Sequence, residues 1–269
     1  MTGFETEGIH GLPTAVRRER VREAVREREF VSVADLSAEF GVSEVTIRSD
    51  LDTLAEGGHI HRVRGGAVHR TAPRLEAPFE QAADRHAAEN ALIGRAAAAL
   101  VESGQTVLMD AGSTVAAVAR ALVARSDLRD LHVFTSGVRV ALELEPAIPD
   151  ATVIVTGGML RPQQHSLVNP FGTVILEQIH AHVGFFGCGG IDAEAGVTHI
   201  SVAEAEIARL AMRASRRRIV VADGSKVGEV SLVHLYPVAD IDLLITDRSA
   251  DPDALAALCE RGLDVQIAD

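Results

Sequence analysis

The sequence predicts an α/β protein with two folded parts, a small helical unit followed by a larger domain with a mostly parallel sheet. Three observations carry this prediction. After residue 83, short β-branched runs such as "TVLM" and "RIVV" alternate with helical stretches, as in parallel α/β folds. The segment that ends at residue 70 is short and rich in arginine. Between them, "RTAPRLEAPFEQAA" has two closely spaced prolines, which interrupt helix and strand alike.

These observations divide the chain into four parts. We expect a flexible N-terminus over residues 1–16, a folded unit over 17–70, a linker over 71–83 and an α/β domain over 84–269. A length of 269 residues suits one large domain or two smaller ones.

The composition is that of a soluble globular protein, with 47% hydrophobic and 24% charged residues. The two cysteines, Cys188 and Cys259, form no C-x-x-C pattern, so we expect neither a disulfide framework nor a cysteine-rich zinc site. No basic-then-apolar leader and no run of 18 apolar residues occurs. We therefore expect a cytoplasmic protein without a membrane segment, a metal site or a cofactor.

The net charge of −12 argues at first against a nucleic-acid partner, but it is unevenly distributed. Residues 17–70 hold ten arginines against ten acidic side chains, whereas residues 71–269 hold 16 basic against 26 acidic ones. A local arginine face still binds phosphate on an acidic protein, so charge alone does not decide the partner.

The first two helices of the N-terminal unit follow from apolar spacing and a capping signal. A helix over Arg17–Arg28 places Val21, Ala24 and Val25 on one face. Ser32 is the expected N-cap of a second helix because an acidic residue, Asp35, follows three positions later. Leu36 and Phe40 then face the core.

A third helix is expected over Glu44–Glu56, after a turn at Gly41 and an N-cap at Ser43. Its apolar residues, predicted to face the core, are Val45, Ile47, Leu51 and Leu54. Its outward side chains near the N-terminal end are Glu44, Thr46, Arg48 and Ser49.

Two helices joined by such a tight turn, with polar side chains at the start of the second, are typical of a helix-turn-helix. The following "HIHRVRGGAVH" predicts a hairpin that turns at Gly65-Gly66 and forms a wing. Arg62 and Arg64 on this wing suit contacts to phosphates or the minor groove. The alternative is a three-helix packing module with solvated charges. We favour DNA binding, through Ser43, Glu44, Thr46, Arg48, Ser49, Arg62 and Arg64.

The larger domain carries polar and glycine-rich loops after its strands, where ligands bind in open α/β sheets. "DAGST" supplies Asp110, an acceptor suited to sugar hydroxyls, and Gly112, Ser113 and Thr114 at a helix start that suits an anion. Glycines that allow close approach of a ligand follow two further strands, at Gly157-Gly158 and in "GCGG", which contains Gly189. Each loop alone also fits a plain turn.

Lys226 is the only lysine of the chain, beside 25 arginines, and follows the run "RIVVADG". A compact ammonium there suits an anionic ligand. The alternative is that a composition biased towards arginine left one lysine at this position by chance. Asp223 either orients the ammonium or neutralises it. His165, in the loop after Gly157-Gly158, is a weaker candidate for ligand contact.

Several of these segments together resemble the DeoR family of bacterial transcription regulators. They are "LSAEFGVSEVTIRSDLDTLAEGGHIHRVRGGAV", "DAGSTVAAVARAL", "VTGGMLRPQQHSLVNPFG", "GFFGCGGIDAEAGVT", "AEAEIARLAM" and "ADGSKVG", spread over residues 17–248. The resemblance implies a winged helix-turn-helix joined to a Rossmann-like sensor domain similar to sugar-phosphate isomerases. It also implies a phosphorylated sugar or related metabolite as effector, and adds Thr135, Ser136 and Glu204 to the effector site.

The chain departs from the family pattern at Asp50, where many relatives carry a second arginine on the recognition helix. It also reads Thr135-Ser136-Gly137 where Thr-Asn-Ser is usual, and Asn169-Pro170 where a glycine is common. The operator and the effector therefore do not follow from the resemblance.

Two functions remain after this reading. The first is a DNA-binding repressor of carbohydrate catabolism genes, controlled by the effector and without catalytic residues, and expected to form a dimer or tetramer that spans two half-sites. The second is a sugar-phosphate isomerase or transferase with an accessory DNA-binding module. Isomerisation requires a carboxylate base and an electrophile, and Asp110, Asp223 and Lys226 supply those groups on paper. We favour the regulator, because an enzyme leaves the N-terminal unit unexplained.

Overall fold

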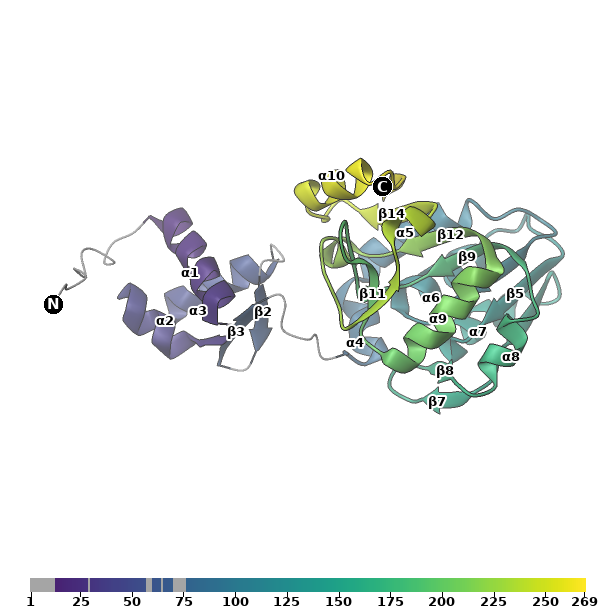
Figure 1. The fold of residues 1–269 in the computed structure, drawn as a ribbon, viewed down its shortest axis with the longest axis horizontal. Coiled ribbons are helices and arrows are strands. Elements are labelled where there is room, and N and C mark those ends of the chain that lie inside the picture. The colour runs from purple at the N-terminus through teal and green to yellow at the C-terminus, as the bar shows by residue number, and fades with distance from the viewer. Residues whose placement is uncertain (1–12, 29, 57–59, 64, 70–75) are drawn as a thin grey trace. The chain divides into compact units, whose positions relative to one another are not determined.

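The computed structural model describes residues 13–28, 30–56, 60–63, 65–69 and 76–269. The chain divides into two compact units, Met1–Ala72 and Pro73–Asp269 (Figure 1). Each unit has a hydrophobic core of its own.

The N-terminal unit combines helices with a small antiparallel sheet of order β1-β3-β2. Its described elements are α1 (Thr14–Arg28), β1 (Phe30–Ser32), α2 (Val33–Phe40), α3 (Glu44–Glu56), β2 (Ile60–Val63) and β3 (Gly66–His69). The predicted helices and hairpin are confirmed, and Gly65 at the turn has the left-handed φ of +86°. Strand β1 was not predicted. It pairs Val31 with Ala67 and is too short for alternating polarity to show in the sequence.

The core of this unit contains the predicted faces of α1, α2 and α3, with one error. Ile47 and Leu51 are fully buried and Leu54 nearly so, but Val45 is 73% exposed. Successive helix residues are about 100° apart, so a residue two positions before Ile47 faces nearly the opposite way. The prediction that Val45 faces the core is wrong, and Asp50 occupies the buried face in its place.

The helix boundaries are set by the predicted caps. The Ser32 hydroxyl accepts the Asp35 backbone N–H at 3.0 Å, and the Ser43 hydroxyl accepts the Thr46 N–H at 3.2 Å. Between them, Gly41 ends α2 with a φ of +61°. These contacts satisfy N–H groups that a helix start leaves unpaired, and they place α2 and α3 on either side of a tight turn.

A buried ion pair connects α1 to α3. The carboxylate of Asp50, which is 2% exposed, accepts bonds from Arg17 at 2.6 and 3.2 Å and from Arg18 at 2.9 Å. The residue at which this chain departs from the family pattern therefore lies inside the N-terminal unit and contributes to its packing.

The C-terminal unit is built around a seven-stranded sheet of order β15-β14-β12-β9-β4-β5-β6. All its pairings are parallel, which confirms the predicted fold class. The strands are β4 (Thr106–Met109), β5 (Leu131–Thr135), β6 (Ala151–Val155), β9 (Ala181–Phe186), β12 (Ser215–Val221), β14 (Leu243–Asp247) and β15 (Val265–Ala268).

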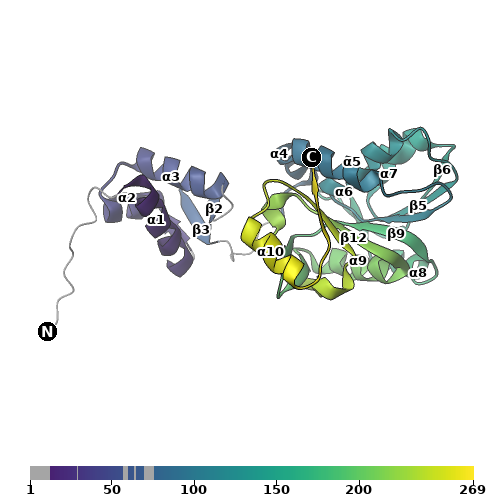
Figure 2. The same cartoon turned by 90° about the horizontal axis from the view of Figure 1, so that it is seen from above.

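Helices cover both faces of this sheet (Figure 2). They are α4 (Phe79–Arg85), α5 (Ala87–Ala98), α6 (Ser113–Val123), α7 (Val138–Leu144), α8 (Gly172–Leu176), α9 (Val202–Ala214) and α10 (Pro252–Glu260), with single 3₁₀ turns at Glu145–Ala147, Gly224–Lys226 and Val238–Asp240. Residues 79–83, the last part of the predicted linker, lie in α4.

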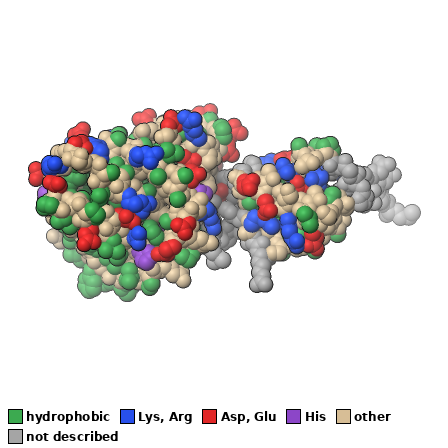
Figure 3. Space-filling view, turned by 180° about the vertical axis from the view of Figure 1, so that it is seen from behind, with side chains coloured by type: hydrophobic (Ala, Val, Ile, Leu, Met, Phe, Trp, Pro, Cys, Tyr) green, Lys and Arg blue, Asp and Glu red, His purple; other side chains and the backbone are tan. Residues whose placement is uncertain are grey.

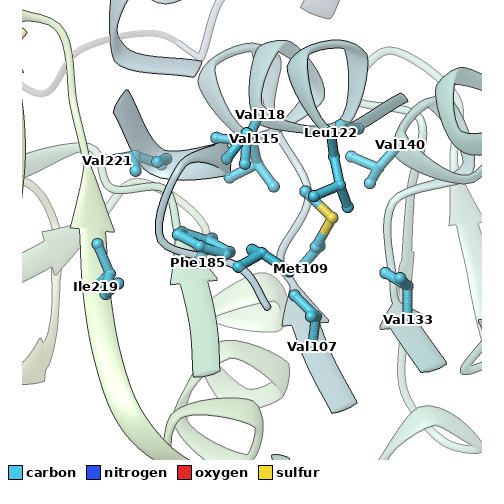
Figure 4. Packing of buried hydrophobic residues seen from close by; sticks show 14 of the residues in the cluster. Val107, Met109, Val115, Val118, Leu122, Val133, Val140, Phe185, Ile219 and Val221 are labelled. Carbon is cyan, nitrogen blue, oxygen red and sulfur yellow. The ribbon is translucent and has the colours of Figure 1, made fainter. Parts of the chain in front are cut away.

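The face with α5, α6 and α7 buries an aliphatic core against the strands (Figure 4). Met109 and Phe185 from neighbouring strands lie beneath Val115 and Val118 of α6 in this core. Small alanines along α6 let it pack closely, since all residues from Thr114 to Ala119 are buried. The opposite face has a second core, to which α9 contributes Ile207 and Met212.

The strand order reverses between β4 and β9. From β4 the chain proceeds outward to β5 and β6, then returns to the other side of β4 with β9 and continues to β15. The carboxyl ends of β4 and β9 therefore lie at the switch point of the sheet, where doubly wound folds in general have a crevice that binds ligands.

Two small antiparallel sheets complete the unit. The first is the hairpin of β7 (Met159–Arg161) and β8 (Ser166–Val168), whose glycine Gly158 allows close packing because a Cβ there would lie 2.0 Å from the Val168 carbonyl oxygen. The second combines β10 (Gly190–Asp192), β11 (Gly196–His199) and β13 (Val233–Tyr236).

Candidate functional site

The N-terminal unit presents one exposed face of α3. Val45, Arg48 and Ser49 are exposed and lie three and four positions apart, so they share a side of the helix. Arg48 bonds Glu44 one turn earlier at 2.7 Å, which extends both side chains along this surface. Ser43 and Thr46 lie at the helix start, where their hydroxyls bond each other at 2.9 Å. The predicted residues of α3 therefore gather at its N-terminal end, with Val45 as an addition.

The hairpin holds one of the two predicted arginines in a defined place. Arg62 bonds Asp52 of α3 and the Gly66 carbonyl oxygen, both at 2.9 Å. Arg64 lies outside the described residues. On the face of this unit shown in Figure 3, basic and acidic side chains alternate without a large basic field.

In the C-terminal unit, Asp110 lies at the carboxyl end of β4, beside the reversal of strand order. It is 8% exposed. Burial raises the pKa of Asp110 to about 7, helped by the charge of Glu204 and opposed by N–H bonds from Ala111 and Gly187. Its carboxyl group is therefore shared between neutral and ionised forms near neutral pH.

The start of α6, next to Asp110 in the chain, has no side-chain cap. Gly112 precedes the helix with a φ of +116° and no side-chain cap, so the first helical N–H groups lack the oxygen that a serine or threonine cap would supply. Ser113 follows, and Thr114 is 2% exposed with a hydroxyl that has no partner among the described residues. Free donors at the start of an 11-residue helix favour an anion.

Glu204, in the first turn of α9, is the centre of a network that only partly followed from the sequence. Its carboxylate bonds Arg161 at 2.6 Å, lies 3.6 Å from His199 and accepts a bond from the Ser166 hydroxyl. Burial lowers the pKa of His199, against the opposing charge of Glu204. The sequence prediction missed Arg161, Ser166 and His199, which lie on strands β7, β8 and β11 of the two small antiparallel sheets.

Lys226 lies on the 3₁₀ turn after β12. Its ammonium is 3.4 Å from Asp223, which also lies 3.8 Å from His86 of the α4–α5 junction. Burial alone would raise the pKa of Asp223, but the charges of Lys226 and His86 and a bond from Ser225 lower it to about 2. Asp223 is thus an anion at neutral pH, held beside a cation that is 22% exposed.

The other predicted effector residues have varied surroundings. Thr135 is buried and bonds the Gly137 N–H at 2.9 Å, whereas the His165 ring bonds Glu80 at 2.6 Å and contacts Phe79 edge-on. Those at strand ends or in the loops that follow are Thr135, Ser136, Gly157, Gly158 and Gly189.

Among the described residues, no group of three or more His, Cys, Asp or Glu side chains is placed to hold a metal ion. None of the described helices is both long enough and apolar enough to cross a bilayer. The two cysteines form no disulfide; Cys188 is buried and Cys259 is exposed.

A winged helix-turn-helix followed by a doubly wound sensor fold defines a class of ligand-responsive DNA-binding proteins. Family models agree over most of the chain: the DeoR-like helix-turn-helix domain matches residues 17–72 and the DeoR C-terminal sensor domain matches residues 85–248. The chain belongs to the DeoR family of transcriptional regulators.

Its curated relatives are similar along nearly their whole length. The transcriptional regulator GolR of Listeria innocua is 33% identical over 253 residues, which cover 94% of this chain and 98% of GolR. A putative aga operon repressor of Escherichia coli O157:H7 is 34% identical, with 94% and 93% covered. Among solved structures, the sorbitol operon regulator SorC of Klebsiella pneumoniae covers 91% of this chain and 98% of its own, with 13% identity and a TM-score of 0.41.

Proposed function

We propose that the chain represses genes of carbohydrate catabolism by reading an operator with the exposed face of α3. The observation that supports this is the grouping of Val45, Arg48 and Ser49 on one side of the helix, opposite the buried Ile47 and Leu51. Arg48 suits a guanine edge or a phosphate, and the Val45 side chain suits a thymine methyl group. Arg62 and Arg64 contact the DNA backbone beside it.

We also propose that a phosphorylated sugar binds at the carboxyl ends of β4, β9 and β12. At the start of α6, the Thr114 hydroxyl and the first helical N–H groups bind oxygens of the effector. Asp110 accepts from sugar hydroxyls, and Lys226 supplies a compact positive charge. A relative from Escherichia coli, 28% identical, is named the glycerol-3-phosphate regulon repressor, which is consistent with a small phosphorylated effector.

The DNA part is tested by selecting binding sites from a random-sequence pool with the full-length protein. We expect a common motif whose recovery depends on Arg48. A pool without enrichment would refute sequence-specific binding. Half-site recognition also leads us to propose a homo-oligomer, which sedimentation of the protein with and without the selected site would test.

The effector part is tested by thermal shift with glycerol 3-phosphate, ribose 5-phosphate, fructose 1-phosphate, fructose 6-phosphate and inorganic phosphate. A compound that binds the folded state at 100 times its Kd stabilises it by about 2.7 kcal/mol. We expect at least one sugar phosphate to raise Tm and to change affinity for the selected site. The absence of any shift across a wider set of phosphorylated sugars would refute this effector class.

The pKa of Asp110, about 7, is the observation that favours an isomerase, because it suits a general base. We propose binding without turnover, because the ammonium of Lys226 is engaged with Asp223. Incubation of the protein with the same sugar phosphates, followed by product analysis, decides between them. Turnover that Asp110→Asn abolishes would establish the enzyme.

A further inference from the structure

Arg161 binds two carboxylates that belong to different parts of the sensor unit. Its guanidinium makes bonds of 2.5 and 3.1 Å to Glu76 and lies 2.6 Å from an oxygen of Glu204. Glu204 is close enough to Asp110 for its charge to help raise the pKa of that carboxyl group, whereas Glu76 is the first described residue after residues 70–75. Arg161, Glu76 and Glu204 are 28%, 24% and 12% exposed, so solvent competes only partly for these bonds. One side chain thus connects the effector crevice to the beginning of the sensor unit.

The loop that follows Arg161, between β7 and β8, also bonds the residues after Glu76. We call residues 76–86 the entry segment. The Phe79 N–H donates to the Gln163 carbonyl at 2.8 Å, and the Gln164 side chain donates to the Ala77 carbonyl at 3.0 Å. His165 then bonds Glu80 at 2.6 Å. Helix α4 is therefore fastened to the β7–β8 loop by contacts along its first turn.

The C-terminal end of the entry segment lies near another residue of the proposed effector site. His86 lies 3.8 Å from Asp223, the partner of Lys226. A change in charge at either contact therefore acts on the segment by which the chain enters the sensor unit from the DNA-binding unit.

We propose that the effector phosphate binds Arg161 in competition with Glu76, so that effector binding releases the entry segment from the β7–β8 loop. This inference rests on the proposed function and names how its site is regulated. A phosphate carries up to two negative charges and three acceptor oxygens, and it accepts the planar guanidinium fork as well as a carboxylate does. Glu76 accepts from two nitrogens of Arg161, so a phosphate that binds the same edge of the guanidinium displaces it. Glu204 stays in place because it also accepts from Ser166 and lies beside His199.

Thermodynamic linkage predicts how the charge of Glu76 changes the affinity for the effector. If Glu76 competes with the effector, then removing its charge raises effector affinity, because binding no longer displaces a partner. The same change lowers the effect of the ligand on DNA, because the ligand-bound arrangement is already populated. A carboxylate that merely supports the fold of the site would have the opposite effect on affinity.

The test compares Glu76→Gln with Glu143→Gln in the full-length protein. Glu143 is a matched control because it also binds two arginine groups, Arg120 at 3.2 Å and Arg139 at 2.9 Å, away from the crevice on α7. Calorimetry with the five compounds of the thermal-shift set measures affinity. Hydrogen exchange of residues 76–86 and binding to the selected DNA site are measured with and without each compound.

For Glu76→Gln we expect effector binding at least about fivefold tighter than wild type, within the usual range of allosteric coupling. Without ligand, its entry segment should exchange about as fast as that of the ligand-bound wild type, and its DNA affinity should differ from wild type at least fivefold. Glu143→Gln should match wild type in each measurement. Weaker or unchanged effector binding by Glu76→Gln would overturn the proposal.

The ligand-free measurements separate this inference from the proposed effector class. If no compound binds wild type, the effector class fails, while the DNA affinity of ligand-free Glu76→Gln still decides the inference. A DNA affinity equal to that of wild type overturns it. Arg161→Lys provides a second variant, which keeps the positive charge but loses the planar guanidinium that bonds two carboxylates. The backbone amides of its entry segment should exchange hydrogen as fast as those of Glu76→Gln.

Discussion

The buried carboxylate of Asp50 should be a main source of stability in the DNA-binding unit. Replacing Asp50 with Asn keeps the volume of the side chain but removes the charge that holds Arg17 and Arg18. Breaking a fully buried pair costs about 3–5 kcal/mol. Arg17 is 12% and Arg18 32% exposed, so both regain some hydration, and we expect a smaller loss of about 2–3 kcal/mol.

Hydrogen exchange of the full-length protein measures this loss in the N-terminal unit alone. At about 1.36 kcal/mol per tenfold, amides in the second half of α3 should exchange about 30- to 160-fold faster in Asp50→Asn. Peptides from the C-terminal unit should be unchanged, because each unit has its own core.

Asp52 supplies a control on the same helix. It is 58% exposed and bonds Arg62 at 2.9 Å, so Asp52→Asn should cost less than about 1 kcal/mol and change exchange less than about fivefold. Equal effects of the two substitutions, or wild-type exchange in Asp50→Asn, would refute the reasoning that burial gives the pair its strength.

Four further predictions concern the two sites. Arg48→Ala should abolish binding to the selected DNA site in gel shifts without changing Tm, and unaltered binding would remove α3 as the reading helix. Arg62→Ala should weaken binding to all sequences and lower the salt slope by about one, so an effect confined to one base pair would contradict a phosphate contact. Lys226→Ala should keep DNA binding and weaken effector affinity by about 1.5–3 kcal/mol; Lys226→Arg should resemble it in an effector titration, and a curve superimposable on wild type would exclude a need for the ammonium. Asp110 has a folded pKa of about 7 against an unfolded value of 3.8, so the folded state holds its proton more tightly and stability falls as pH rises through 7. Asp110→Asn should therefore resist urea better than wild type at pH 8, by on the order of 1–4 kcal/mol, but little at pH 4.

Periodicity and capping signals were enough to predict the N-terminal unit. The bounds of α3 and the serine caps followed from single residues, because a cap and an apolar spacing are local properties. The prediction of Val45 as a core residue is wrong because its spacing from Ile47 places it on the opposite side of the helix. The buried ion pair of Asp50 could not be predicted, since a partner 33 residues earlier leaves no local signal.

The candidate effector site was predictable only where its residues follow strands. Asp110 and Lys226 follow recognisable strands, so their place at one edge of a parallel sheet could be inferred. Arg161 and His199 lie on strands of the small antiparallel sheets. Tertiary packing, which the sequence does not reveal, decides whether these strands lie near the crevice. Their pairing with Glu204 had no counterpart in the spacing of the sequence.

The order of strands in the central sheet has a consequence for how the protein is made. Strand β4 pairs with β9, and Thr106 bonds His182 at a separation of 76 residues, so the middle of the sheet closes only after most of the chain exists. The N-terminal unit needs only contacts among its own first 72 residues, which form quickly because they are local. During synthesis the part that reads DNA therefore folds before the part that senses the metabolite. A chain cut short in the sensor unit would retain the residues of a compact helix-turn-helix unit but lack part of the proposed effector site.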